Sequence, residues 1–343
     1  MVDIDKLVRA NIRSLAPYSS ARDEFSGSEG VFLDANENPF GTLNRYPDPY
    51  QKVLKNAISN LKGIPEQNIF LGNGSDEVID LLFRLFCNPG KDKALTFSPT
   101  YGMYEVSASI NDVVLLKIPL NKDFQINKSE LSEWLIDEKL KLIFVCSPNN
   151  PTGNAILNSD LEYIINHFNG IVVIDEAYID FSSKPSFLDR VSTYSNLVVL
   201  QTFSKAWGLA GVRVGMAFSN PGIITYLNKI KPPYNISTIN QKAVLERIRD
   251  SDKFAIELRK IIQERERLLT LLNKLSMVQY IYPSDANFLL VEVKDADLVY
   301  KKLVKQKIIV RNRTKIVNNC IRITVGTKEE NNLLIDVLSK MEL

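Results

Sequence analysis

The sequence predicts an α/β fold in which a mostly parallel sheet is covered by helices and is followed by a smaller α+β domain. Two patterns predict it. From residue 52 to residue 230, short apolar segments rich in β-branched residues alternate with segments of helical spacing, as expected where helices connect parallel strands. From about residue 240, a long charged amphipathic segment precedes further strand-like segments. A chain of 343 residues has room for about two such domains.

The larger domain is expected over residues 31–238, after an N-terminal arm of residues 1–30 that is too short to form a domain. Apolar runs bounded by turn residues predict strands at 31–33, 68–71, 94–97, 113–116, 142–146, 171–175 and 198–200. Helical spacing predicts helices at 52–61 and 78–86. A capping box, Ser159-Asp160-Leu161-Glu162, predicts a third helix that runs to His167.

The smaller domain is expected over residues 239–343. Residues 240–275 predict one or two long helices that link the two domains. Strands are expected at 278–281, 288–293, 308–310 and 320–325, and helices at 297–305 and 327–341. The last helix begins with a second capping box, Thr327-Lys328-Glu329-Glu330.

Composition excludes several kinds of partner and chemistry. The 42 basic and 40 acidic residues leave a net charge of +2, too small to indicate nucleic acid or an anionic membrane surface as a partner. The longest apolar runs are shorter than the ~20 residues of a membrane helix, and the acidic N-terminus lacks the features of a signal peptide. We therefore expect a cytoplasmic protein.

His167 is the single histidine, which excludes His-based catalytic triads and multi-His zinc sites. Its place near the end of a helix favours a solvated histidine over a catalytic one. The cysteines are odd in number, widely spaced and set in apolar segments, which predicts buried free thiols at Cys87, Cys146 and Cys320. Proton transfer must therefore use lysine, tyrosine or a carboxylate.

Residues 201–215 are the strongest candidate for a site. They follow the apolar run 197–200, so Lys205 lies just past the carboxyl end of a strand, where open α/β sheets bind their ligands. Ser204 and Arg213 add a hydroxyl and a second cation. The alternative is a polar loop with an incidental lysine.

Three other loops at strand ends carry unusual residues, and each has a purely structural alternative. Residues 72–77 lead from a strand into a helix, so backbone N–H groups and the Ser75 hydroxyl could bind a phosphate, or the segment is a glycine turn with a helix cap. Residues 147–153 could direct Asn150 at a ligand oxygen, or they form a rigid turn. Asp175 ends an apolar strand and needs a partner, which could also be a cap or an internal ion pair.

Together these residues meet the needs of one cofactor, a pyridine ring that carries a phosphate. Such a cofactor needs a lysine to form an imine, an acid to keep the ring nitrogen protonated, donors for the phenolic oxygen and a site for the anion. These parts are supplied by Lys205, by Asp175, by Asn150 with Tyr178, and by Ser75 with Ser204 and Arg213. We expect burial and neighbouring positive charge to lower the pKa of Lys205, which makes it the nearest base.

Several motifs resemble the fold-type-I pyridoxal-phosphate aminotransferases, and within them the histidinol-phosphate aminotransferase family. They are Ser-Pro-Asn-Asn-Pro-Thr-Gly at 147–153, Asp-Glu-Ala-Tyr at 175–178 and Ser-Lys-x-x-x-Leu-Ala-Gly-x-Arg at 204–213. The similarity continues at 16–18, 33–39, 45–47, 74–77, Arg311 and 320–326, which is nearly the whole chain. These motifs are more specific for the fold and the cofactor than for the substrate.

The resemblance implies a large domain around a seven-stranded, mostly parallel sheet, a small domain with which the N-terminal arm packs, and a homodimer with shared sites. It also implies the role of each matching residue. Lys205, Asp175 and Tyr178 are catalytic; pyridoxal phosphate is bound by these three and by Ser75, Asp76, Tyr101, Asn150, Ser204, Arg213 and the partner subunit's Tyr46; substrate is bound by Tyr18, Asn150, Arg311 and Arg322.

The implied reaction interconverts histidinol phosphate plus 2-oxoglutarate with imidazole acetol phosphate plus glutamate, in histidine biosynthesis. Within the same fold, a broad aromatic or aspartate aminotransferase and a threonine-phosphate decarboxylase stay open. A pyridoxal-phosphate-dependent transcription regulator would need a DNA-binding domain, for which the ~30 residues before the first motif are too few. A relative without chemistry is disfavoured by Lys205 and Asp175.

Overall fold

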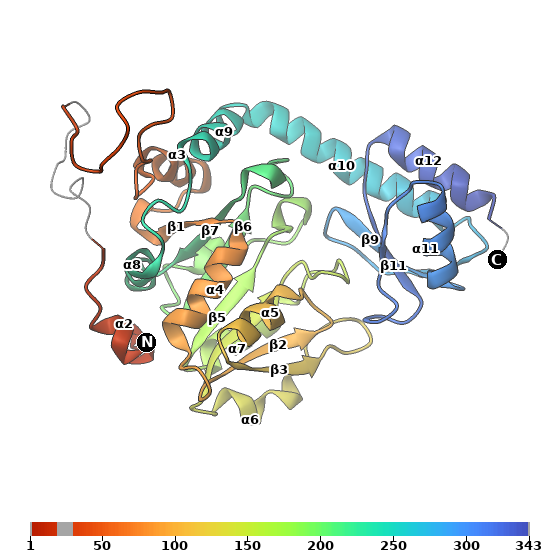
Figure 1. The fold of residues 1–343 in the computed structure, drawn as a ribbon. Helices are drawn as coiled ribbons and strands as arrows, with labels where there is room; N and C mark the ends of the chain where they lie inside the picture. Colours follow the sequence, from red (N-terminus) through yellow and green to blue (C-terminus); the bar gives the residue numbers. More distant parts are fainter. Residues whose placement is uncertain (1, 19–29, 342–343) are drawn as a thin grey trace.

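The computed structural model describes residues 2–18 and 30–341. A large unit is built on a seven-stranded sheet of order β1-β7-β6-β5-β4-β2-β3, and a small unit on a four-stranded sheet of order β10-β11-β9-β8 (Figure 1). The strands of the large sheet are β1 (Ile69–Asn73), β2 (Lys93–Ser98), β3 (Val114–Pro119), β4 (Leu140–Cys146), β5 (Ile171–Asp175), β6 (Leu197–Thr202) and β7 (Val214–Ser219). The predicted α/β architecture is confirmed.

Most neighbouring strands of the large sheet are parallel, and β7 alone is antiparallel to its neighbours β6 and β1. Successive side chains of a strand point to opposite faces. In β5, Val172 and Ile174 enter one apolar core, and Ile171 and Val173 enter another. Because helices cover both faces, the whole strand is apolar, as the sequence shows.

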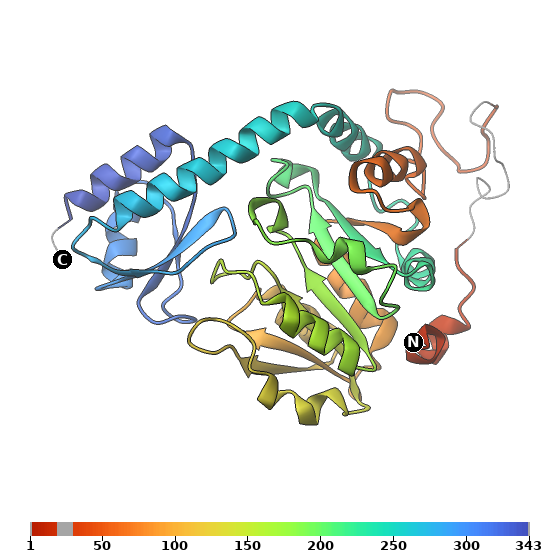
Figure 2. The same ribbon diagram turned by 180° about the vertical axis from the view of Figure 1, so that it is seen from behind.

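Different helices cover the two faces of the large sheet (Figures 1 and 2). One core includes residues of α4 (Ser75–Phe86), α5 (Met103–Ile110) and α8 (Pro221–Ile230). The other includes residues of α3 (Lys52–Lys62) and α7 (Asn158–His167). The short helix α6 (Ser132–Leu135) lies between β3 and β4 in the chain. Because β2 to β6 run parallel, the loops that follow these strands lie at the same edge of the sheet.

The small unit is reached through two helices, α9 (Thr238–Arg249) and the long α10 (Ser251–Leu272), which spans from the large to the small unit in Figure 2. The unit contains β8 (Val278–Ile281), β9 (Phe288–Val293), α11 (Ala296–Lys305), β10 (Arg311–Asn312), β11 (Cys320–Thr324) and α12 (Lys328–Ser339). Its core contains Ile321 and Ile323 of β11 and Leu289 and Val291 of β9. The alternate residues of these strands face away from that core.

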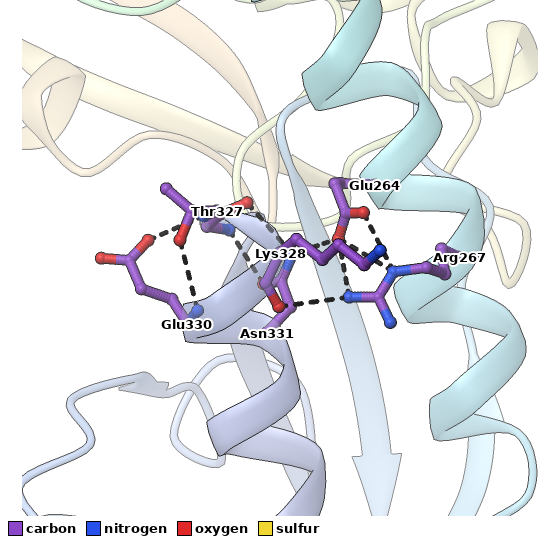
Figure 3. A network of polar contacts seen from close by, with 7 residues as sticks. Glu264, Arg267, Thr327, Lys328, Glu330 and Asn331 are labelled. Carbon is purple, nitrogen blue, oxygen red and sulfur yellow. Dashed lines mark hydrogen bonds and ion pairs between the residues drawn. The ribbon is translucent and has the colours of Figure 1, made fainter.

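The predicted capping box at the start of α12 is present. Thr327 Oγ1 accepts from the Glu330 amide, and Glu330 accepts from the Thr327 amide at 2.7 Å. Next to it, Asn331 donates to Glu264 of α10 at 3.1 Å, and Glu264 forms an ion pair with Arg267 at 2.8 Å (Figure 3). This network anchors α12 on the long helix.

Three local predictions were wrong. Residues 31–33 form no strand, and Val31 and Leu33 are 88% and 89% exposed. The strand expected at 308–310 begins at Arg311 instead. The helix α7 begins at Asn158 with Leu157 as its N-cap, so Ser159 lies inside the first turn and caps nothing. Two of these errors concern the ends of elements, which local sequence predicts least well, and the third concerns an exposed segment without a sheet neighbour among the described residues.

The N-terminal arm packs differently from the prediction. Its helices are α1 (Ile4–Leu7) and α2 (Ala10–Arg13). The Arg9 amide donates to the Leu85 carbonyl of α4 at 3.1 Å, and Val8 is buried in the core that α4 and α8 share. Tyr226 of α8 donates to Asp5 at 2.8 Å. The described part of the arm thus contacts the large unit, not the small one, while residues 19–29 lie outside the described residues.

Candidate active site

A pocket of about 110 Å³ lies at the carboxyl ends of the large sheet's strands. Its walls follow the ends of β1, β2, β4, β5 and β6, where ligands of α/β sheets bind. It is lined by Ser75, Asp76, Tyr101, Cys146, Asn150, Asp175, Ala177, Tyr178, Thr202, Ser204, Lys205 and Arg213. The fold therefore brings together every residue predicted to bind the cofactor from within this chain.

Lys205 lies in the turn after β6. Thr202, the last residue of β6, shapes this turn because its hydroxyl accepts from the Ser204 amide at 3.1 Å. The Lys205 ammonium lies over the Tyr178 ring, 5.5 Å from its centroid. Burial, and then the positive charge of Arg322, lower the pKa of Lys205, although Asp175 opposes the shift. The expected lowering of this pKa is confirmed, and it favours a neutral amine that can act as a base.

Asp175 is the last residue of β5 and is only 2% exposed. Its two carboxylate oxygens accept from the Tyr104 hydroxyl at 2.8 Å and from the Ala177 amide at 3.1 Å. Burial raises the pKa of Asp175 to about 6, while these two hydrogen bonds oppose the rise. Within the described residues Asp175 forms no ion pair, so the internal pair that the sequence left open is not present. A buried carboxylate on a pocket wall is suited to a positively charged ligand atom.

The phosphate-binding segment predicted at 72–77 has the backbone that such a site needs. Gly74 is the N-cap of α4 with φ of 76°, a conformation that residues with a Cβ rarely adopt. No side chain of the described residues caps this helix, so its first N–H groups are left to other acceptors. The Gly74 amide donates to the Arg213 carbonyl at 2.9 Å, which holds Arg213 beside the helix start. The segment is therefore a glycine turn whose helix start has N–H groups free to bind an anion.

Asp76 positions two other residues of this corner. Its carboxylate accepts from the Tyr101 hydroxyl at 2.9 Å and from Arg213 at 3.3 Å. Burial, and then Asp76, raise the pKa of Tyr101, which keeps that phenol protonated. Arg213 and the Ser204 hydroxyl line the same pocket as Ser75. The corner thus combines a helix N-terminus, two hydroxyls and a guanidinium, a set of donors that suits a phosphate dianion.

Asn150 connects the pocket to the small unit. Its side-chain amide donates to the Tyr178 hydroxyl at 3.4 Å, and its carbonyl oxygen accepts from Arg322 of β11. The turn that carries it is rigid as well, because the neighbouring Asn149 donates to Thr152 and to the Pro99 carbonyl at 2.8 Å each. Arg322 of the small unit thus contacts a wall residue of the pocket, although it does not line the pocket itself.

Three predicted residues lie away from the pocket. Tyr46 is 49% exposed, stacks on Tyr234 at 4.4 Å and lines a separate surface groove. Tyr18 is 68% exposed. Arg311 is exposed and lies directly opposite Arg322 in the β10–β11 pair. Within this one chain, these residues do not line the pocket.

The sequence reasoning missed several residues of this region. Tyr104 contacts Asp175, Thr202 forms the Lys205 turn, and Cys146 and Ala177 line the pocket. Tyr104 follows Tyr101 by three residues, a spacing that places two side chains on one side of a helical turn. Arg313 was also missed. The register of β10 and β11 brings it close to Arg322, and in the sequence only its spacing of two residues from Arg311 indicates that the two arginines share a face.

The chain is similar to known proteins along its whole length. Residues 25–338 match the family model Aminotransferase class I and II. A histidinol-phosphate aminotransferase from Parabacteroides distasonis is 51% identical over 346 residues, which covers 100% of each chain. This chain belongs to the histidinol-phosphate aminotransferase family. A second member, from Cytophaga hutchinsonii, is 50% identical over 342 residues and 98% of each chain.

A solved member of the family has the same fold. The crystal structure of histidinol-phosphate aminotransferase from Sinorhizobium meliloti in complex with pyridoxal-5'-phosphate aligns with a TM-score of 0.78 and 24% identity, over 89% of each chain. The predicted fold-type-I class is thereby confirmed. In the part of the chain that the structure describes, no helix is both long and apolar enough to cross a membrane. No His, Cys, Asp and Glu side chains gather as a metal site there either.

Proposed function

We propose that this enzyme is a pyridoxal-phosphate-dependent aminotransferase that transfers an amino group between L-histidinol phosphate and 2-oxoglutarate. The products are imidazole acetol phosphate and L-glutamate, in a step of histidine biosynthesis. The observation that carries the proposal is that Lys205 and Asp175 line one pocket beside an uncapped helix N-terminus. Two family members that are named histidinol-phosphate aminotransferases share 51% and 50% sequence identity with this chain.

The residues of the pocket fit pyridoxal phosphate. The helix start at Ser75, with the Ser204 hydroxyl and Arg213, would hold its phosphate, because these are donors that favour a dianion. Asp175 would hold the ring nitrogen, and Asn150 with Tyr178 the ring oxygen. Lys205 is the residue that would bond to it. Gly215 packs so closely on the Ser75 backbone that a Cβ there would collide with the Ser75 amide and displace the helix start.

When bound, the cofactor supplies a ring that accepts the electron pair left at the substrate's Cα. The chain's own residues then have three tasks. Lys205, with its lowered pKa, would take the proton from that carbon and deliver it to the cofactor carbon bonded to the amino nitrogen, and it would move the proton back in the reverse direction. Asp175 keeps a negative charge in a buried place, where it stabilises a positive ring nitrogen far more than it would in water. Tyr101, on the pocket wall, limits the positions that a bound ring can take.

Arg322 and Arg311 are proposed to bind the anionic ends of the substrates, together with Asn150 and Tyr18. A guanidinium binds phosphate and carboxylate with the same planar fork, so one site accepts histidinol phosphate and glutamate in turn. Burial, and then the positive charge of Arg311, lower the pKa of Arg322, while Tyr178 opposes the shift. A bound anion would raise this pKa again. We infer that an anion would stabilise both charges.

We also propose that residues 31–238 and 239–343 are the two domains and that two copies form a homodimer. Val31, Leu33, Phe40 and Leu43, in the segment that leads to Tyr46, are exposed apolar residues, and such patches often mark protein interfaces. In this proposal Tyr46 serves the cofactor of the partner subunit. The enzyme would act in the cytoplasm, where its small-molecule substrates are metabolised.

A substrate panel tests the proposal. The purified holoenzyme is supplied with 2-oxoglutarate and, in separate reactions, with histidinol phosphate, phenylalanine, aspartate or threonine phosphate, and glutamate and carbon dioxide are measured. We expect the highest kcat/KM for histidinol phosphate and no carbon dioxide. A higher value for phenylalanine or aspartate would indicate a broad aminotransferase, and carbon dioxide from threonine phosphate would indicate a decarboxylase.

A further inference from the structure

Three arginines share one face of the small sheet. Arg311 and Arg322 are directly opposite in the β10–β11 pair, and such residues point to the same face. The Arg313 amide donates to the Cys320 carbonyl at 2.8 Å, which continues this pairing by one residue. Because alternate residues of a strand share a face, Arg313 lies on the same side as Arg311.

This face is turned toward the active-site pocket. The other face, with Ile321 and Ile323, packs under the helices of the small unit. On the arginine face, the Arg322 guanidinium lies 5.1 Å from the Phe288 ring centroid and donates to Asn150. Phe288 in turn packs edge-on against Tyr178, with 5.2 Å between ring centroids. The arginine face therefore adjoins the wall of the cofactor pocket.

The positive charge of this face has no counterion in the structure. In the described part of the chain, no Asp or Glu forms an ion pair with Arg311, Arg313 or Arg322. Glu292 shares the face through its register with Cys320, but its hydrogen bond is with the Tyr282 hydroxyl at 3.4 Å. Like charges opposite each other destabilise a sheet, so the arrangement needs an anion from outside the chain.

Of the three arginines, Arg313 is the one without a role in the proposed function. Unlike the exposed Arg311, it is partly buried. Its Nε is buried and makes no hydrogen bond within the described residues, and the same is true of Arg322 Nε. Burial, and then Arg322 and Arg311, lower the pKa of Arg313. A cation that has lost its water without gaining an acceptor is the form expected of a ligand-binding group in the absence of its ligand.

We propose that Arg313 is a specificity-determining residue that binds, beside Arg311, the phosphate of the substrate. This inference rests on the proposed function and adds to it. A phosphate monoester carries nearly two negative charges and three acceptor oxygens, so it can occupy two guanidinium forks at once. A carboxylate needs only one. Arg313 thus favours the phosphorylated amino donor over amino acids of similar size.

The test replaces Arg313 and compares two donors that differ only in the phosphate, histidinol phosphate and L-histidinol. Arg313→Met keeps an unbranched side chain and removes the charge, and we expect it to lower kcat/KM for histidinol phosphate about 10- to 100-fold, mainly through KM. With L-histidinol the change should stay under about threefold. Arg313→Lys keeps the charge without the fork and should fall between the two.

The matched control is Lys315→Met, which removes one exposed positive charge from the same turn. Its values should stay close to those of the wild type with both donors. Equal losses in the Arg313→Met and Lys315→Met enzymes, or equal losses with both donors, would overturn the inference. Melting temperatures identify a folding defect, and if Arg313→Met does not fold, Arg313→Lys takes its place in the comparison.

A second readout does not depend on turnover. Calorimetric titration of the holoenzyme with inorganic phosphate should give a Kd at least about tenfold weaker for Arg313→Met than for the wild type and Lys315→Met. An unchanged Kd would contradict the inference. If the wild type does not convert histidinol phosphate, the proposed function is wrong, and the phosphate titration still decides whether Arg313 binds a phosphate.

Discussion

At the scale of single residues, Asp175 is the group on which the electron-accepting role of the pocket depends. Its carboxylate is buried and has no ion-pair partner among the described residues, and in the proposed function the positive ring nitrogen of the cofactor would supply the missing charge. Asp175→Asn removes a buried charge pair of about 3–5 kcal/mol, and kcat should fall roughly 100- to 5,000-fold while cofactor is still bound. A loss under about tenfold in steady-state assays would remove this role from Asp175.

Tyr104 acts through Asp175 and not on the substrate. Its ring stacks on Phe144 at 5.0 Å, so Tyr104→Phe keeps the packing and removes only the hydroxyl that donates to Asp175. That hydrogen bond lowers the pKa of Asp175, so its loss should move the acidic limb of the kcat–pH profile to higher pH and reduce kcat about tenfold. The control is Tyr163→Phe on α7. An unmoved acidic limb would mean that Tyr104 serves packing alone.

At the scale of secondary-structure elements, Glu176 ties the end of β5 to its surroundings. Its buried carboxylate accepts from the Ser186 hydroxyl and the Phe187 amide in the following loop and from Gln201 of β6, at 2.5, 2.6 and 2.9 Å. Burial raises the pKa of Glu176 from 4.5 to about 7, although these hydrogen bonds oppose the rise. The loop after β5 is thus held by the Glu176 carboxyl group, which changes its protonation near pH 7.

The shift of Glu176 predicts a pH dependence of stability. Between pH 4.5 and about 7 the folded protein keeps a proton that the unfolded chain has lost, so the contribution to the unfolding free energy is present below pH 4.5 and lost as the pH rises through 7. The loss should be roughly 3 kcal/mol. Denaturant unfolding of the cofactor-free protein at pH 5 and pH 8 should show it. Glu176→Gln should remove most of this difference and leave the smaller part that the raised pKa of Asp175 contributes, whereas the exposed Glu133→Gln should keep all of it. A difference as large in Glu176→Gln as in the wild type would contradict the assignment.

The same scale shows what the sequence could predict. The pocket residues of the Lys205, Asp175 and Asn150 loops could be predicted because each lies within a few residues of a strand end, a local pattern. Tyr104 could not, because it reaches Asp175 from α5, 71 residues earlier in the chain. Arg313 depends on the register of two strands, and the wrong cap at Ser159 shows that a motif alone does not decide where a helix begins.

At the scale of the whole molecule, we propose that Tyr46 completes the active site of the partner subunit. Tyr46 lies outside the pocket of its own chain and lines a surface groove together with the start of α9. If it completes the partner's site, Lys205→Ala and Tyr46→Ala proteins that are inactive alone should regain activity when they are dissociated and reassociated together. Each mixed dimer would then hold one site with both defects and one with neither.

The control is a protein that carries both substitutions in one chain, mixed with the wild type. Under the shared-site proposal every site of such a mixed dimer carries one defect, so the mixed dimers should be inactive. A mixture of the single variants that stays inactive although size measurements detect mixed dimers would show that Tyr46 serves its own subunit. Sedimentation of the wild type measures whether the dimer exists at all.

The central claim is that the pocket around Lys205 uses pyridoxal phosphate to take the amino group of histidinol phosphate. The most direct measurement is a single half-reaction, in which histidinol phosphate is added to the wild-type holoenzyme without 2-oxoglutarate. We expect the visible absorption of the bound cofactor to change, one imidazole acetol phosphate to form per site, and 2-oxoglutarate to restore the original spectrum, with no such cycle in Lys205→Ala. A wild-type spectrum that responds to aspartate or phenylalanine but not to histidinol phosphate would contradict the claim.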